Sequence, residues 1–282
     1  MQQEIESEID VIGSATRQQL PAERIGYLWA VLASKYRKAG NFTSSEKAYL
    51  KSLELQRNTP SAARNYATTL DNFGMLYLVY GKLDEATRYN RMGEKVREGL
   101  GIPLELARSK EHLAEIDLAR HRFKQAEMES MEALEVMRAV NDPEPLDRIA
   151  ALNGLAFTHC LLRRCAEGLA AAQESVALAK SSFGADSMPA AHAMMALGFA
   201  SWKGGRLQEA EPAMRSAIET MRAQPVPAGR SLLLALIEYQ NYLTQSHRDE
   251  EADNVTKELT TEKALLAKEC ASCVNVQSLL QR

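Results

Sequence analysis

The stretch TLDNFGMLYLVYGKLDEATRY, residues 69–89, contains the pattern that decides the fold. Its apolar side chains recur at intervals of three and four, as on one face of an α-helix: Leu70, Phe73, Tyr77 and Tyr80. Gly81 follows this run, and a second helical run begins near Leu83. The stretch therefore predicts two α-helices joined by a short turn, in which Gly81 takes the left-handed conformation.

The same pattern recurs along the whole chain. A small residue follows each turn at spacings of 41, 40, 42, 42 and 42: Ser45, Ala86, Ala126, Gly168, Ala210 and Ala252. A large apolar residue stands thirteen positions before each of these: Leu32, Phe73, Leu113, Leu155, Leu197 and Tyr239. The turns carry glycine at Gly40, Gly81 and Gly205, and other residues at some conformational cost at His121, Arg163 and His247. Repeats of this length predict a stack of helix pairs.

These residues resemble the tetratricopeptide repeats (TPRs), in the longer form of about 42 residues typical of kinesin light chains. The positions that carry the resemblance in residues 69–89 are Leu70, Phe73, Gly74, Tyr77, Gly81, Leu83, Asp84, Glu85 and Ala86. The resemblance covers about residues 22–262. It implies an all-α fold, a right-handed α-solenoid (superhelix) of about six helix-turn-helix TPR units.

The repeat period also predicts the organisation of the chain. Ile5, Ile9 and Ile12 have helical spacing, so we expect an N-terminal capping helix within residues 1–21 that covers the exposed apolar face of the first repeat. A C-terminal tail is expected at residues 269–282. The six repeat units between them are expected at about 22–59, 60–101, 102–142, 143–185, 186–225 and 226–268.

Composition narrows the class of protein. The 282 residues carry 34 basic and 37 acidic side chains, a net charge of −3. Such a balance gives no reason to expect a nucleic-acid or anionic-membrane partner, since these need concentrated basic surface. No apolar run reaches the roughly 18 residues of a membrane span. We expect a soluble cytoplasmic protein; a leader removed before residue 1 stays an open alternative, as does a longer parent protein.

No residue pattern indicates an enzyme. Cys270 and Cys273 have CxxC spacing, but a zinc site needs two further ligands and a redox site is expected beside a βαβ pattern. Glu111, His112 and Glu115 lie within one helical turn, without the ligands from a second helix that a metal site in a bundle requires. The sequence therefore predicts no catalytic residue, no metal and no cofactor.

The first helix of each pair is expected to face inward, because solenoids of helix pairs bind partners on that concave surface. The repeat register places a set of side chains there, which includes Lys203 and Glu238. The candidate residues for binding a peptide or partner segment are Arg37, Lys38, Asn72, Met75, Arg108, His112, Phe157, His192, Phe199, Trp202 and Asn241.

These residues suggest how a partner is held. Phe157, Phe199 and Trp202 occupy neighbouring inward positions and are expected to form an aromatic pocket; the alternative is that they pack between adjacent first helices. Arg37, Lys38 and Arg108 favour an acidic side chain or a C-terminal carboxylate in the partner. The resemblance to kinesin light chains implies that Asn72 bonds to the backbone of an extended peptide.

The function predicted is therefore a non-enzymatic protein-interaction module, a monomer or weak homodimer. One alternative stays open at this point. The run VNVQSLL, residues 274–280, is apolar enough to occupy a groove, so the chain could instead be a self-assembling or autoinhibited scaffold filled by its own tail or a second copy.

Overall fold

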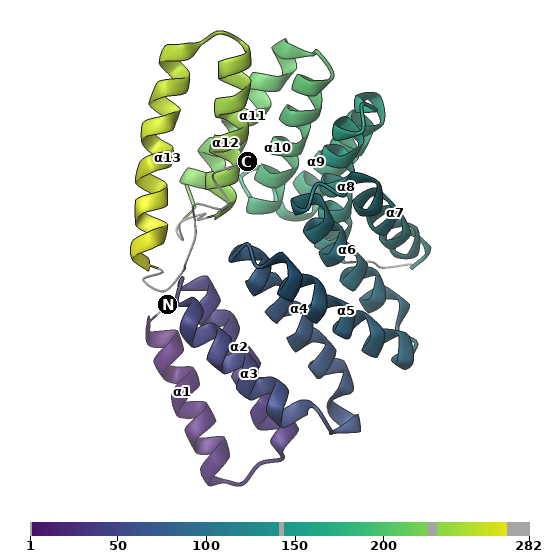
Figure 1. The fold of residues 1–282 in the computed structure, drawn as a ribbon, viewed down its shortest axis with the longest axis vertical. Coiled ribbons are helices and arrows are strands. Elements are labelled where there is room, and N and C mark those ends of the chain that lie inside the picture. The colour runs from purple at the N-terminus through teal and green to yellow at the C-terminus, as the bar shows by residue number, and fades with distance from the viewer. Residues whose placement is uncertain (1, 141–143, 225–229, 270–282) are drawn as a thin grey trace. The chain divides into compact units, whose positions relative to one another are not determined.

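The computed structural model describes residues 2–140, 144–224 and 230–269, and these residues are almost entirely helical (Figure 1). Cys270, Cys273 and all but the first residue of the expected tail lie outside the described residues. The helices that the structure describes are α1 (Gln2–Arg17), α2 (Ala22–Lys38), α3 (Phe42–Gln56), the short 3₁₀ turn η1 (Pro60–Ala62), α4 (Ala63–Val79), α5 (Leu83–Leu100), α6 (Pro103–Ala119), α7 (Phe123–Ala139), α8 (Pro145–Leu161), α9 (Cys165–Phe183), α10 (Met188–Lys203), α11 (Leu207–Arg222), α12 (Arg230–Gln245) and α13 (Asp249–Glu269).

The described helices group into two compact units that divide within α6, with residues 1–112 forming the body of unit 1 and residues 113–264 forming unit 2. In unit 1, α2 packs against α3 and α4 against α5, while α3 contacts α4 to join the two pairs. Helix α1 lies on α2, where Ile5 and Ile12 form an apolar cluster with Leu32. An ion pair of 2.6 Å between Lys35 Nζ and Glu8 Oε2 adds to this contact.

Unit 2 repeats the same arrangement. Helices α8 and α9 form one pair and α10 and α11 another, and α7–α8, α9–α10 and α11–α12 contacts link successive pairs. The first helices α8, α10 and α12 contact one another in that order, as the stack in Figure 1 shows. The predicted all-α solenoid is confirmed.

The turns between paired helices follow the predicted backbone pattern. Three of them place glycine in the left-handed region, with φ values of 73°, 71° and 79° at Gly40, Gly81 and Gly205. The other three force a larger residue into it: His121 (58°), Arg163 (64°) and His247 (55°). All six positions are confirmed, and the last three carry a conformational cost of roughly 1 kcal/mol each relative to glycine.

A small residue in the middle of five of the six first helices allows close packing: Ala33, Gly74, Ala114, Ala156 and Gly198. A Cβ atom built on Gly198 would lie 3.1 Å from the backbone oxygen of Ala210 and 3.0 Å from the backbone nitrogen of Met214. Backbone atoms cannot move aside as a flexible side chain does, so α10 and α11 touch here at the shortest separation that their backbones permit. This contact fixes the spacing of the pair and hence where the first helix stands.

Candidate partner-binding surface

Aromatic rings form the base of the first-helix face of unit 2, which comprises the inward-projected side chains of α8, α10 and α12. The Phe157 ring on α8 lies 4.6 Å from the Phe199 ring on α10, between centroids. Trp202 meets Phe199 edge-on at 6.0 Å and meets Tyr242 of α12 in the same way at 6.0 Å. A continuous row of rings therefore joins the three first helices.

The exposed fractions of these rings show whether they line an open pocket or pack between helices. Phe199 is only 3% exposed and Trp202 only 6% exposed, whereas Phe157 is half-buried. The expectation of an open aromatic pocket is corrected: the two rings of α10 pack between adjacent first helices, as the alternative interpretation held. They contribute by fixing the positions of the polar side chains above them.

Lys203 stands directly on this aromatic base. Its Nζ atom lies 3.4 Å from the centre of the Trp202 ring and 5.6 Å from that of Phe199, which places a cation over a π face while the side chain stays exposed. Desolvation by the surrounding protein lowers the pKa of Lys203, and the charge of Glu238 opposes that shift. The ring beneath it thus favours this position of the lysine head group.

Glu238 on α12 is the charge partner of Lys203. The side chain is half-buried, and burial raises its pKa while the charge of Lys203 acts to lower it. The two residues therefore interact electrostatically across α10 and α12. This face consequently presents both a positive and a negative group to a ligand.

Two further polar side chains on this face reach the surface. His192 near the start of α10 and Asn241 on α12 are both exposed. Desolvation lowers the pKa of His192, and Glu115 on α6 opposes this shift. His192 therefore favours its neutral form, in which one ring nitrogen donates and the other accepts a hydrogen bond.

The remaining candidate residues belong to unit 1. Lys38 is exposed at the C-terminal end of α2, and the others are half-buried on α2, α4 and α6: Arg37, Asn72, Met75, Arg108 and His112. The structure brings His112 Nδ1 to 3.6 Å from Asp71 Oδ2. His112 is therefore tied to a buried carboxylate as well as lying at an inward position.

A buried polar network around Asp71 was not predicted from the sequence. Asp71 Oδ2 on α4 accepts hydrogen bonds from Arg97 Nη1 of α5 at 2.6 Å and from Ser109 Oγ of α6 at 3.1 Å. Arg97 Nη1 also lies 2.8 Å from Ser109 Oγ. The separations in sequence, 26 and 38 residues from Asp71, match no repeat period, so no pattern indicated this network.

Two other kinds of site are absent from residues 2–140, 144–224 and 230–269. No group of three or more His, Cys, Asp or Glu side chains there is arranged to hold a metal ion. None of the helices there combines the length and the apolar composition needed to cross a bilayer.

Sequence comparison then identifies the repeats. Residues 147–223, which span α8 to α11, match the family model described as tetratricopeptide repeat. The match to tetratricopeptide repeats thus covers two helix pairs of unit 2. No curated protein matches the sequence.

Solved structures share the fold of this chain at low sequence identity. RapI in its apo form has a TM-score of 0.74 and 12% identity, and the match covers 95% of this chain and 94% of that one. NprR in complex with its cognate peptide NprX has a TM-score of 0.64 and 15% identity, over 99% and 83% of the two chains. BtubC (BKLC) from P. vanneervenii has a TM-score of 0.65 and 19% identity, over 79% and 91%.

Proposed function

We propose that this TPR protein is a non-enzymatic protein-interaction module that binds a peptide segment of a partner on the first-helix face of unit 2. The observation that carries the proposal is the placement of Lys203 on the buried ring of Trp202, with Glu238 as its charge partner. A lysine that its own fold already holds in place loses little conformational entropy when it binds a carboxylate.

The other groups of the face complement a peptide. His192 and Asn241 are exposed and offer hydrogen-bond donors and acceptors, which suit the amide groups of an extended backbone. Lys203 suits an acidic side chain or a terminal carboxylate, and Glu238 suits a basic group or a backbone N–H. The NprR structure with its cognate peptide shows that a protein of this fold can hold a peptide.

The candidate residues of unit 1 suit the same kind of ligand, an acidic peptide. Lys38, Arg37 and Arg108 add positive charge on the first helices α2 and α6. Asn72 and Met75 lie on α4 between them in sequence. We propose that they form a binding surface of unit 1 for an acidic segment of a partner.

The experiment is a peptide-display selection on the full chain, followed by fluorescence anisotropy of the enriched peptides. Lys203→Glu reverses one charge on the face, and Lys180→Glu is the matched control because Lys180 is an exposed lysine on the second helix α9. Lys203→Glu is expected to weaken binding at least about tenfold and Lys180→Glu less than about twofold. Equal losses in both variants, or enriched peptides without an acidic group, would contradict the proposal.

A further inference from the structure

Two pockets of unit 2 occupy equivalent places in the repeat. The α11/α13 pocket has a volume of about 210 Å³ and the α7/α9 pocket about 790 Å³. Nine residues line the α11/α13 pocket, and each has a counterpart 84 residues earlier in the lining of the α7/α9 pocket. For example, Arg215 corresponds to Met131, and Val255 corresponds to Ala171. An offset of 84 is two repeats of 42. The two pockets therefore lie at equivalent positions of the repeat and differ in how much of the space their side chains fill.

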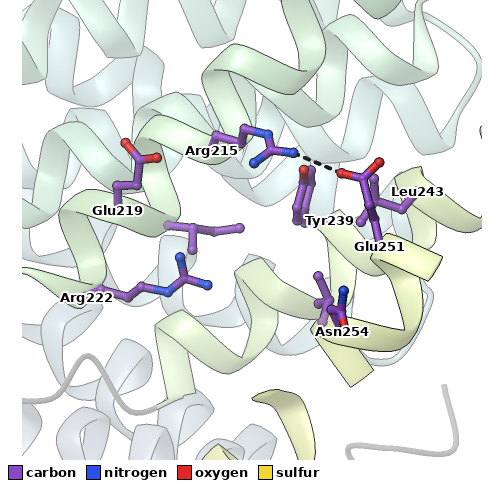
Figure 2. Close-up of a pocket in the computed structure, with 9 residues that line it drawn as sticks. Arg215, Glu219, Arg222, Tyr239, Leu243, Glu251 and Asn254 are labelled. Atoms are coloured by element: carbon purple, nitrogen blue, oxygen red, sulfur yellow. Dashed lines mark hydrogen bonds and ion pairs between the residues drawn. The ribbon is translucent and has the colours of Figure 1, made fainter. Parts of the chain in front are cut away.

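Side chains span and fill the α11/α13 pocket. Arg215 and Glu251 point toward each other across it in Figure 2, with Arg215 Nη2 at 3.2 Å from Glu251 Oε2. The Arg215 guanidinium also lies 5.4 Å from the centre of the Tyr239 ring. Arg222 pairs with Glu258 at 2.5 Å and ties the same two helices a second time. Little room is left for a ligand.

The α7/α9 pocket keeps one of these ion pairs, because Arg138 and Glu174 stand where Arg222 and Glu258 stand, but it lacks the other fillers. Met131 stands where Arg215 stands, and Leu155 replaces Tyr239, so the bridging arginine and the ring are both absent. Ala170 and Ala171 replace Asn254 and Val255 on the opposite wall. Shorter side chains at four equivalent positions contribute to the larger volume, because the helix spacing leaves space that only side chains can fill. The α7/α9 pocket also extends along seven further lining residues.

The lining of the α7/α9 pocket is apolar at its centre. Met128 is 47% exposed and Met131 54% exposed on α7, above a floor of buried leucines: Leu134, Leu152 and Leu155. Methionine is flexible and polarisable, so it adapts to the side chains of a binding partner. Exposed methionines above buried leucines are typical of a surface that binds apolar side chains of a partner.

Charged residues surround this apolar centre, and acidic groups exceed basic ones. The lining carries five carboxylates, Glu127, Glu132, Glu135, Glu167 and Glu174, against three basic side chains, Lys124, Arg138 and Arg164. Arg138 and Arg164 are paired within the chain with three of these carboxylates: Arg138 with Glu174 at 2.8 Å, and Arg164 with Glu127 and, at 3.4 Å, with Glu167. Lys124 is then the one remaining basic group of the lining, against Glu132 and Glu135. The excess of carboxylates favours a partner with positive charge.

We propose that the α7/α9 pocket is a second docking surface, which binds an amphipathic α-helix of a partner protein with leucine-like side chains on one face and lysine or arginine along its edges. From Lys124 to Arg138, α7 runs about 21 Å beside the pocket, the length of about four helical turns. A partner helix laid along α7 inserts apolar side chains over Met131 and places its basic groups near the carboxylates. This surface is separate from the first-helix face, so it does not rest on the function proposed above.

The test uses the full chain and a fluorescein-labelled model helix of about 16 residues, with leucines every three or four positions on one face and lysines on the other. The variant Met131→Arg/Ala170→Asn/Ala171→Val copies three of the four side chains that fill the α11/α13 pocket, and Leu155 is kept. Because those side chains coexist at equivalent positions in this chain, the variant is expected to keep its helicity. Ala177→Asn, at an exposed position of α9 outside the pocket, is the matched control.

The wild-type chain is expected to bind the lysine peptide at least about tenfold more tightly than the filled variant, while Ala177→Asn and Lys203→Glu leave binding unchanged. A matching peptide with glutamate in place of lysine is expected to bind at least about tenfold more weakly. Absence of binding to the wild type, equal binding to the filled variant, or equal binding of both peptides would overturn the proposal. If the wild type sediments as a dimer and the filled variant as a monomer, the pocket binds a second copy of this chain. That result would equally overturn the proposal.

Discussion

Replacing Phe199 with alanine tests whether the row of rings in unit 2 supports the fold. The side chain is 3% exposed and contacts the rings of Phe157 and Trp202. Removing a buried ring of roughly 150–200 Å² at ~25 cal/mol per Å² costs about 4–5 kcal/mol, consistent with the usual cost of a large-to-small change in a core. Phe183, which is 39% exposed at the end of α9, is the matched control, and its replacement by alanine is expected to cost less than about 1 kcal/mol.

Urea denaturation followed by far-UV circular dichroism measures both variants. A repeat protein can unfold in parts, so the early portion of the curve is expected to move most in Phe199→Ala, as the repeats around α10 lose order first. Equal shifts for the two variants would refute the reasoning. Such a result, combined with loss of peptide binding in Phe199→Ala alone, would restore the interpretation of this ring as an exposed anchor.

Three further predictions concern stability. Arg97→Met leaves the buried carboxylate of Asp71 without its cation and is expected to cost about 3–5 kcal/mol in urea denaturation; a loss below about 1 kcal/mol would contradict a buried pair. Hydrogen bonds led by that from Arg248 lower the pKa of Glu211 to about 2, so its contribution to stability is present above the ordinary value of 4.5 and is lost as pH falls toward 2. The difference in melting temperature between wild type and Glu211→Gln should therefore shrink over that range, and a difference independent of pH would count against the ion pair. Arg163→Gly relieves a left-handed residue with φ of 64° and is expected to raise stability by about 1 kcal/mol in thermal denaturation, whereas an unchanged or lower melting temperature would show that no strain is stored there.

The repeat period was sufficient to predict the helices and their turns. A left-handed residue is needed wherever two helices of a pair are joined so tightly, so Gly81 and its equivalents mark the same place in every unit, and Arg163 could be assigned by alignment alone. Such features depend on backbone geometry, which each repeat specifies locally.

The candidate surface was predictable only in part. The register placed Phe199 and Trp202 on the inward face but could not give their burial, because that depends on how close α8, α10 and α12 stand to one another. Lys203 was projected to the same face, yet its place on the Trp202 ring depends on a side-chain conformation. Only contacts that repeat have a signal in the sequence: the ion pairs Arg138–Glu174 and Arg222–Glu258 lie 84 residues apart, which is two repeats.

The backbone contact at Gly198 has a genetic consequence. Every codon change that replaces a glycine adds a Cβ carbon, and at this position that carbon meets main-chain atoms of α11. Gly205, by contrast, has open space around it and is constrained only by its φ of 79°, a conformation that His121 and His247 adopt in other turns. In a complete substitution scan, Gly198 should therefore accept no replacement without loss of folded protein, and Gly205 should accept several polar ones.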